Sequence, residues 1–318
     1  MNILITIDVE DWFQVENFKQ YIPFSSWDSY ELRVEKNTHK IFDLLNSNPG
    51  NPTNPSNPTN PKATFFILGW IAERLPHLVR EIHTRGHEVA SHGYCHNLCN
   101  QQSKEDIKKD LSDSKKMLED IISAPIYGYR APSFSIDKDI LKIIQDCGYL
   151  YDSSYNSFSM HGRYGRLNLS QNKRKGIAFQ IADPRPLTPD PRFYELPISN
   201  IKLWNHIFPF GGGAYFRLIP YFLFKMGVKS ILNSKKTYLL YLHPWEIDPE
   251  QPMLNSASIF FKFRHYVNLN KTASRLASFI ETFKECSFIT CHHYLEQTVT
   301  INPINQSNPI NRRCKQIR

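Results

Sequence analysis

The chain has 318 residues, of which 41% are hydrophobic and 21% charged, so it can bury a large core and is neither collagen-like nor wholly disordered. No run of about 18 apolar residues occurs, so we expect no membrane-spanning helix, although attachment to a membrane surface stays open. Lys and Arg outnumber Asp and Glu by 38 to 30, and this mild excess is too weak to indicate a nucleic-acid partner.

The predicted fold begins at the N-terminus, with a buried strand at residues 3–8. A signal peptide would need a basic start, a longer apolar stretch and a small-residue cleavage site, and the opening residues have none of these features. We therefore expect a cytoplasmic protein. Its six cysteines are too sparse for a disulfide scaffold, and we expect them to be reduced thiols.

Strand-like and helix-like stretches alternate along the chain. Strands are predicted at residues 3–8, 63–68, 88–91, 126–129, 149–151, 194–198, 238–243 and 287–290, and helices at 28–45, 71–84, 104–122, 136–146 and 272–283. This alternation predicts an α/β fold with a parallel sheet, most simply a β/α barrel. In such a barrel the chemistry lies at the C-terminal ends of the strands.

Two segments rich in Asn-Pro pairs are expected to lie outside the core. Residues 47–62 contain five such pairs, and proline removes backbone donors and disfavours helix at the residue before it, so we predict a disordered insertion. Residues 301–318 have a similar composition and are predicted to form a disordered basic tail. Lysines interrupt the apolar stretch 215–232, for which we favour a core-facing helix over a membrane-surface helix.

Three carboxylates follow the first predicted strand, at Asp8, Glu10 and Asp11, with no nearby Lys or Arg to pair them. Their mutual repulsion is unfavourable unless a cation lies among them or each is well solvated. His92 and His96 are four residues apart just after another strand, which directs both imidazoles to one side. Two histidines and one carboxylate leave coordination positions open for water and substrate, so the pattern indicates a catalytic metal site.

A structural zinc site is the competing interpretation, with Cys95 and Cys99 joining the two histidines. Its ligand spacing is compressed and does not match the usual two-knuckle pattern, so we favour the catalytic site. Two further polar residues follow predicted strands. The Arg130 guanidinium could pair with the acidic cluster, and His243 is a candidate general acid.

Five motifs together resemble the polysaccharide deacetylase family, of the NodB-homology or carbohydrate esterase family 4 type. They occur in the order and spacing of that family: Asp8, His92-x-x-x-His96, Arg130-x-Pro132, Asp152 and Leu242-His243. Segments 8–13, 243–249 and 264–269 are similar to a subgroup found with bacterial exopolysaccharide biosynthesis and exosortase loci. The resemblance implies a distorted (β/α) barrel of about seven strands over residues 1–245, and a C-terminal extension at 246–300 that packs on the barrel or completes it.

The resemblance also implies the metal ligands. His92 and His96 match the two metal-ligand histidines of the family. The common family opening has two adjacent aspartates, the second of which binds the metal, and Val9 stands at that position here. Glu10 or Asp11 must therefore supply the carboxylate, and we favour Glu10 because relatives with an acid-x-acid opening use the second acid. Zinc suits this ligand set best, with cobalt, nickel or iron as alternatives.

The same resemblance implies the acid–base residues. Asp8 resembles the catalytic base and Arg130 the residue that orients it, while His243 matches the general acid and Asp152 resembles the carboxylate that tunes that acid. The metal would polarise the acetyl oxygen and acidify water, the base would take the water proton, and the acid would protonate the departing amine. A backbone N–H near Tyr94 would help to stabilise the oxyanion.

Substrate contacts are expected from residues that adjoin the motifs, although core packing explains their aromatic members equally well. These residues are Trp12, Tyr94, Pro132, Phe134 and Trp245. The resemblance implies a metal-dependent hydrolase that removes N-acetyl groups, less readily O-acetyl groups, from an amino-sugar-containing polysaccharide or exopolysaccharide precursor. The alternatives are a related barrel amidohydrolase acting on a small non-peptide amide and a non-catalytic glycan-binding scaffold. Whether Arg264 and His265 reach the site stays open.

Overall fold

The computed structural model describes residues 1–46, 60–158, 164–181, 192–204 and 206–299. Most of the predicted Asn-Pro-rich insertion, residues 47–59, and the predicted basic tail, residues 301–318, lie outside the described residues. In the described part of the chain, no helix is long and apolar enough to cross a bilayer.

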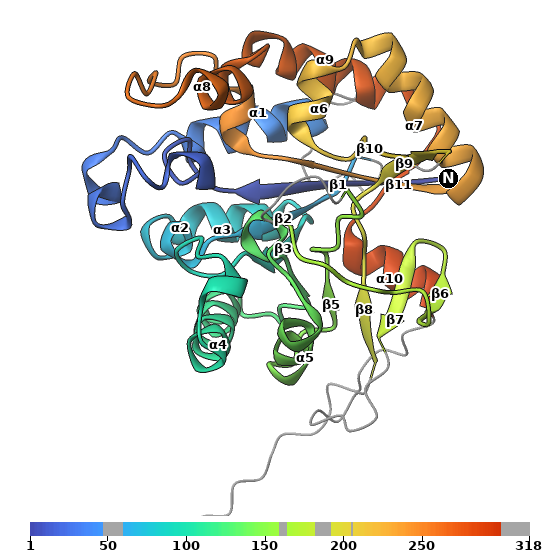
Figure 1. The fold of residues 1–318 in the computed structure, drawn as a ribbon, viewed down its shortest axis with the longest axis horizontal. Coiled ribbons are helices and arrows are strands. Elements are labelled where there is room, and N and C mark those ends of the chain that lie inside the picture. The colour runs from blue at the N-terminus through green and yellow to red at the C-terminus, as the bar shows by residue number, and fades with distance from the viewer. Residues whose placement is uncertain (47–59, 159–163, 182–191, 205, 300–318) are drawn as a thin grey trace, which may run out of the picture.

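Seven parallel strands form the main sheet (Figure 1). Their order is β11 (Thr237–Leu242), β1 (Asn2–Val9), β2 (Ala63–Ile67), β3 (Glu88–Ser91), β4 (Gly128–Tyr129), β5 (Tyr151–Asp152) and β8 (Phe193–Glu195). The antiparallel strands β7 (Ala178–Ile181) and β6 (Lys173–Lys175) continue the sheet beyond β8. The predicted α/β fold with a parallel sheet is therefore confirmed.

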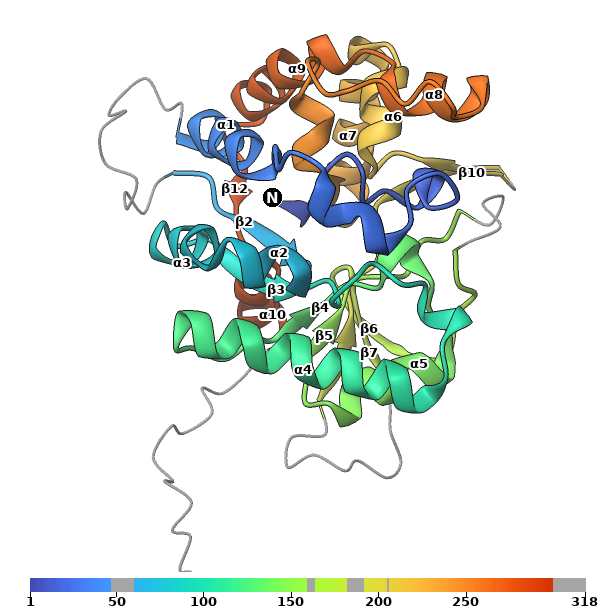
Figure 2. The ribbon, with the colours of Figure 1, turned by 90° about the vertical axis from the view of Figure 1, so that its left-hand side faces the viewer.

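Helices surround this curved sheet. They are α1 (Val34–Asn46), α2 (Gly69–Arg74), α3 (Pro76–Thr84), α4 (Lys104–Ile122), α5 (Lys138–Asp146), α6 (Gly213–Leu218), α7 (Tyr221–Lys235), α8 (Ile259–Tyr266), α9 (Leu269–Thr282) and α10 (Cys291–Val299). The predicted helix at 71–84 is two helices, because Pro76 disfavours helical backbone at the residue before it. Helices α6 to α9 gather on one side of β1 and β11, and α4 and α5 lie on the other side of the molecule (Figure 2).

The central strands are buried along their whole length, which is typical of parallel strands covered on both faces. Their register pairs Ile7 with Leu242 on one side of β1, and Asp8 with Phe66 on the other. The C-terminal ends of β11, β1, β2 and β3 therefore meet at one edge of the sheet, which brings together the polar residues that follow them.

Residues beyond 245 share the core with the rest of the chain. Strand β12 (Ser287–Phe288) pairs with the first residues of β1, and the ring of Phe279 in α9 packs 6.0 Å from the ring of Tyr238 in β11. A separate antiparallel hairpin of β9 (Asn200–Leu203) and β10 (His206–Pro209) lies next to α7. The sequence pattern did not predict this hairpin.

Candidate active site

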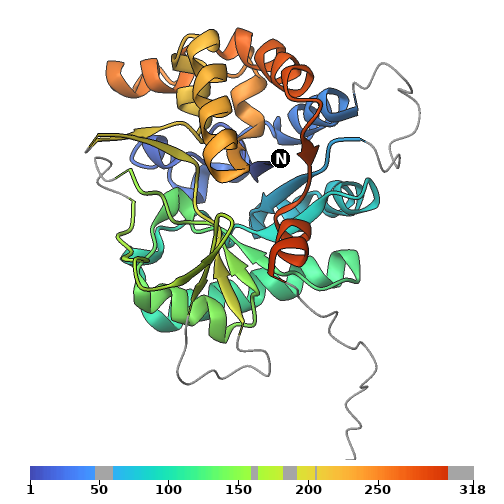
Figure 3. The ribbon, with the colours of Figure 1, turned by 90° about the vertical axis from the view of Figure 1, so that its right-hand side faces the viewer.

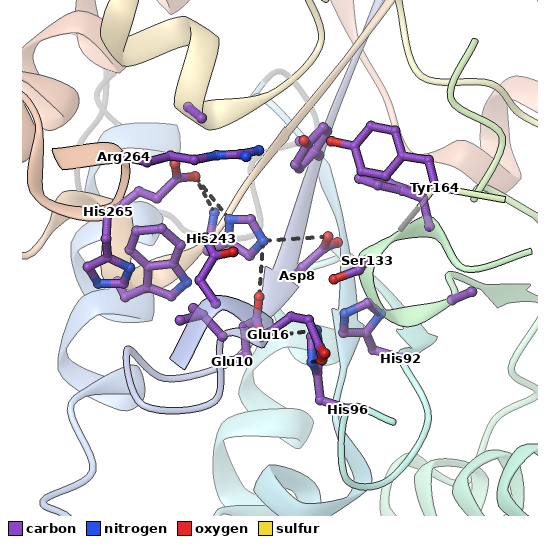
Figure 4. Close-up of a pocket in the computed structure, with 18 of the residues that line it drawn as sticks. Asp8, Glu10, Glu16, His92, His96, Ser133, Tyr164, His243, Arg264 and His265 are labelled. Atoms are coloured by element: carbon purple, nitrogen blue, oxygen red, sulfur yellow. Dashed lines mark hydrogen bonds and ion pairs between the residues drawn. The ribbon is translucent and has the colours of Figure 1, made fainter. Parts of the chain in front are cut away.

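One pocket collects polar side chains from the ends of several strands (Figure 4). Asp8 and Glu10 come from the end of β1, His92 and His96 follow β3, and His243 follows β11. These five side chains point toward one another, although up to 235 positions separate them along the chain. The parallel register of the strands is the reason that they meet.

Glu10, His92 and His96 form a buried group that could hold a metal ion, with one potential ligand atom from each side chain within 4.8 Å of the others. The Nε2 atom of His96 lies 3.3 Å from Oε2 of Glu10, and this oxygen has no hydrogen-bond partner. The Nδ1 atom of His92 lies 2.8 Å from the carbonyl oxygen of Arg130, which leaves Nε2 available as a ligand. A buried carboxylate oxygen without a partner is costly, and a bound cation would satisfy it.

The protonation states of this group also suit a metal. Burial opposes charge on Glu10, yet the neighbouring imidazoles of His96 and His243 outweigh it and hold the pKa of Glu10 at about 2. Burial lowers the pKa of His96 to about 4 and also lowers the pKa of His92. An ionised carboxylate and two neutral imidazoles are the forms that bind divalent ions.

Asp11, the other candidate for the metal carboxylate, is engaged elsewhere. Its Oδ2 accepts hydrogen bonds from the backbone N–H groups of Arg33 (2.6 Å) and Val34 (2.8 Å), at the N-terminus of α1. Its Oδ1 accepts the Trp12 N–H at 2.8 Å, and burial raises the pKa of Asp11 to about 6. Asp11 therefore satisfies helix N–H groups, as a capping residue does, and lies outside the metal-ligand group.

Asp8 is held by a fully buried arginine. The Nη1 atom of Arg130 lies 2.6 Å from Oδ1 of Asp8 and also donates to the hydroxyl of Thr6. The other nitrogens of the guanidinium donate to the carbonyl and hydroxyl oxygens of Ser153. A planar guanidinium with every nitrogen bonded cannot rotate freely, so it fixes the orientation of the Asp8 carboxylate.

His243 lies between two carboxylates. Its Nε2 is 3.0 Å from Oε1 of Glu10 and 3.9 Å from Oδ2 of Asp8, and its Nδ1 is 3.0 Å from Oε2 of Glu246. Burial opposes charge on His243, but hydrogen bonds and charge from Glu10 and Glu246 outweigh it and raise the pKa of His243 to about 10. The imidazole is therefore held in its protonated form.

Glu246 and its partner Arg217 are site residues that the sequence interpretation missed. Nε of Arg217 donates to Oε1 of Glu246 at 3.0 Å, and both side chains are buried. Gly213 makes room for this pair, because a Cβ atom on it would lie 1.9 Å from the Glu246 carboxylate. The sequence contained one indication of the contact between Glu246 and His243, which is their separation of only three residues. The structure places Glu246 in a short 3-10 turn, η5 (Pro244–Ile247), directly after His243.

Asp152 does not occupy the position expected for a residue that tunes His243. Its two oxygens accept hydrogen bonds from the hydroxyl (2.7 Å) and N–H (3.0 Å) of Ser154, and Glu195 lies against it. Burial, followed by the charge of Asp152, raises the pKa of Glu195 well above its usual range, which favours the protonated form of Glu195. The contact predicted for Asp152 is made by Glu246, since Asp152 points into the Ser154 turn that supports Arg130.

The predicted substrate contacts divide into two groups. Phe134 and Trp245 line the pocket. Ser133 and Phe134 both have positive φ, a conformation that costs free energy in non-glycine residues and turns Phe134 toward the site. Trp245 stacks between His243 and His265, with ring centroids 5.1 and 4.1 Å apart, so His265 reaches the site through this stack.

The other three predicted contacts do not line the pocket. Trp12 is 3% exposed and packs edge-on against Phe13 and Tyr30 in an aromatic core. The Tyr94 hydroxyl donates to Glu73, and the Tyr94 N–H donates to Asp110 at 2.9 Å, so this N–H is not free for an oxyanion. Pro132 is buried in the turn, where its neighbours Ala131 and Ser133 line the pocket instead.

The cysteines do not take part in a metal site within the described residues. The Sγ atom of Cys99 lies 3.3 Å from the hydroxyl of Tyr129, and Cys95 accepts a hydrogen bond from Asn97. The five described cysteines are free thiols, and the metal-ligand group found among the described side chains contains none of them. The competing structural zinc site is therefore not formed.

Two family models match the chain. Residues 57–151 match the model described as polysaccharide deacetylase, and residues 153–296 match a domain of unknown function (DUF3473). The boundary between the two matches falls at the end of β5. The site draws on both sides of this boundary, because His92, His96 and Arg130 lie before it and His243 and Glu246 after it.

Curated relatives are similar to the N-terminal part. A peptidoglycan-N-acetylglucosamine deacetylase of Bacillus cereus is 32% identical over 88 residues, which are 28% of this chain and 41% of that protein. A peptidoglycan deacetylase-like protein of Gibberella zeae is 34% identical over 93 residues, which are 29% of this chain and 28% of that protein. The chain thus spans less than half the length of either relative.

A solved structure from Mycobacterium smegmatis, described as an inferred polysaccharide deacetylase, superposes with a TM-score of 0.59 at 18% identity and covers 97% of this chain and 94% of its own. This likeness bears on the fold, and it agrees with the predicted barrel. The deacetylase family is metal-dependent, in keeping with the Glu10, His92 and His96 group. Over residues 57–151 the chain is therefore similar to the polysaccharide deacetylase family.

Proposed function

We propose that the protein is a metal-dependent hydrolase that removes N-acetyl groups from an amino-sugar-containing polysaccharide. One observation carries this proposal. The buried Glu10, His92 and His96 group faces both an arginine-bound carboxylate, Asp8, and a histidine held in its protonated form, His243. A metal site with an acid and a base on either side of it is what the hydrolysis of an unreactive amide requires.

A divalent ion bound by the three ligands, with zinc the best fit, would supply a Lewis acid for the acetyl carbonyl and acidify water. The roles of the protein residues follow from their contacts. Asp8, held by Arg130, accepts the proton of the attacking water. His243 donates its Nε2 proton to the amine nitrogen as the C–N bond breaks, because an unprotonated amine leaves poorly. Glu246 keeps that histidine charged.

The substrate and its location go beyond the family assignment. The Bacillus cereus relative is named for N-acetylglucosamine in peptidoglycan, which supports an N-acetylated amino sugar as the reacting unit. The similarity of segments 243–249 and 264–269 to exopolysaccharide-associated proteins leads us to propose an exopolysaccharide precursor as the polymer. The cytoplasmic location stays a prediction, which fractionation of cells that express the full chain would test.

Acetate release from N-acetylated oligosaccharides tests the proposal. The purified protein should release acetate, lose this activity when a chelator removes the metal, and regain it when Zn²⁺ is added back. Unchanged activity after complete metal removal would contradict the mechanism. A preference for small amides over oligosaccharides would favour the small-amide alternative, and glycan binding without acetate release would favour the scaffold alternative.

A further inference from the structure

The large hydrophobic side chains exposed on this protein are concentrated in one region. Of the thirteen that are exposed among the described residues, eleven lie between positions 203 and 263. Nine of them belong to the β9–β10 hairpin, α7 and α8, and together they define the apolar face: Leu203, Trp204, Phe208, Phe222, Leu223, Met226, Ile259, Phe260 and Phe263. Scattered single hydrophobic residues are normal on a surface, but a concentration of this size indicates an interaction site.

The hairpin lies against α7, and α8 projects toward the same side of the molecule as the hairpin, although α8 lies apart from both in Figure 1. The hairpin and α8 project on the same side of the molecule in both Figure 2 and Figure 3. Helix α7 packs on the hairpin, because the position of a Cβ on Gly227 lies within 3 Å of the side chains of Phe210 and Ile201. Helix α7 turns Phe224, Val228 and other apolar residues to the core and still exposes a second apolar stripe. The predicted core-facing helix therefore also has an apolar outer side.

The segments that build this face contain no acidic residue. Residues 196–245 and 251–280 include ten Lys and Arg residues and no Asp or Glu, although the whole chain has 30 acids. Lys202, Lys225, Lys229 and Lys262 are interleaved with the exposed hydrophobic side chains, and within the described part of the chain none of the four forms an ion pair. The face is thus apolar and cationic at once.

We propose that the apolar face binds the surface of an anionic lipid bilayer. Aromatic and aliphatic side chains that project beside unpaired lysines suit the boundary between acyl chains and negatively charged headgroups. Trp204 is 84% exposed beside the tip of the hairpin, where an indole would enter the interfacial layer. The bound protein would remain on one side of the bilayer, since no described helix can cross it.

Charge argues against a second copy of the chain as the occupant. A symmetric dimer brings the same patch of both copies together, and this would place the lysines of one copy against those of the other. Like charges brought together at an interface oppose association, whereas anionic headgroups neutralise them.

Helix α8 contributes both to the apolar face and to the lining of the pocket. Arg264 follows Phe263 in α8, lines the pocket and, among the described residues, forms no ion pair there. Arg217 of α6, which precedes α7, lines the same pocket. A protein seated on a bilayer through the hairpin, α7 and α8 would therefore hold Arg264 and this wall of the pocket near the lipid surface, where a membrane-anchored glycan could reach it.

Sedimentation of the full-length protein with vesicles tests this inference. The wild type should sediment with vesicles of phosphatidylcholine and phosphatidylglycerol, much less with phosphatidylcholine alone, and progressively less as salt is added. Trp204 supplies a second readout, because the other four tryptophans are at most 7% exposed. The fluorescence emission should shift to shorter wavelength on binding, and this shift should be absent from Trp204→Phe.

Two variants and a matched control separate the apolar and cationic contributions. Trp204→Ser combined with Phe260→Ser should weaken vesicle binding about tenfold or more. Replacing Lys225 and Lys229 with Gln should weaken it about fivefold per lysine. Replacing two lysines of α4, Lys109→Gln and Lys116→Gln, removes the same charge far from the face and should change binding much less.

Several results would overturn the inference: no sedimentation of the wild type with anionic vesicles at low salt, equal binding by the serine variant, or an equal loss in the α4 control. Wild-type dimers that the serine variant fails to form, without vesicle binding, would assign the face to a second copy. A melting temperature equal to wild type shows that each variant is folded. Vesicle binding does not use the metal site, so a failure of acetate release with intact vesicle binding would contradict only the proposed function.

Discussion

The two sides of the candidate site are built in different ways. On the N-terminal side, Asp8, Glu10, His92 and Arg130 lie at the end of a strand or directly after it, so adjacent strands bring them together. On the C-terminal side, only His243 follows a strand. Glu246 comes from a 3-10 turn and Arg217 from a helix 29 residues earlier, and their contact is a buried ion pair. Strand ends therefore mark the first half of the site in the sequence, whereas packing assembles the second half.

The two sides also use arginine in different ways. Arg130 bonds directly to the carboxylate Asp8. Arg217 reaches His243 only through the carboxylate Glu246, which stands between the two cations. Direct contact with a guanidinium orients a base, whereas an intervening carboxylate favours the protonated form of an imidazole. We therefore expect substitutions on the two sides of the site to have different effects on activity and stability.

The largest effect is expected from removing the acid or the base. Asp8→Asn and His243→Ala should each lower kcat by about 10²–10⁴-fold on an N-acetyl oligosaccharide. With nitrophenyl acetate the leaving group needs no proton, so the His243 variant should regain most of its activity and the Asp8 variant should not. Steady-state kinetics with the two substrates measure this, and equal losses on both substrates in both variants would break the assignment of acid and base.

The next effect tests whether the C-terminal side depends on its buried ion pair. Arg217→Met leaves Glu246 uncompensated and also removes the donor to the carbonyl oxygens of His265 and Val267. It should lower the free energy of unfolding by about 3–5 kcal/mol, measured by urea denaturation. The exposed pair of Lys109 and Asp113 in α4 is the control, because Lys109→Met should change stability far less. Equal losses would show that Arg217 does not hold this side together.

A smaller effect distinguishes Glu246 from Asp152. Glu246→Gln removes the charge beside His243 and so lowers the pKa of the imidazole, which should reduce kcat about 10- to 100-fold and move the alkaline limb of the kcat profile to lower pH. Asp152→Asn should leave that limb in place, because Asp152 bonds to Ser154. A pH profile of kcat for both variants measures this, and a shift with Asp152→Asn alone would return the tuning role to Asp152.

The smallest effect concerns stability at the other end of β3, away from the site. Burial, together with the charges of Lys62 and Arg85, lowers the pKa of His87 to about 3, and its Nδ1 accepts the Ala63 N–H. The unfolded pKa is about 6.5, so the unfolded state binds more protons and stability falls as pH drops from about 6.5 toward 3. His87→Asn cannot titrate in this range and should flatten the fall. Urea denaturation at several pH values would detect it, and identical slopes would argue against a role for His87.

Much of the fold followed from the sequence because the buried strands are continuous apolar runs and the helices have a periodic apolar face. The predicted strand at 88–91 and helix at 104–122 match β3 and α4 in their bounds. The β9–β10 hairpin and α8 were missed, because exposed apolar residues on them do not produce the pattern of a half-buried element. Trp12 and Tyr94 adjoin the motifs in the sequence, yet the packing of Trp12 and the Glu73 contact of Tyr94 direct them away from the pocket.

By itself, the sequence determined the resemblance to polysaccharide deacetylases, the α/β fold and the residues at the strand ends, because these depend on local patterns of burial and on the spacing of polar groups along the chain. Only the tertiary structure showed that Glu10, and not Asp11, lies in the metal-ligand group. It also showed that Glu246, and not Asp152, is the carboxylate beside His243. Several carboxylates are similar in the sequence. Which one takes each role depends on which of them lies near a distant strand, helix terminus or guanidinium in the folded chain. Such approaches span up to 235 positions of the chain, and no local pattern encodes them.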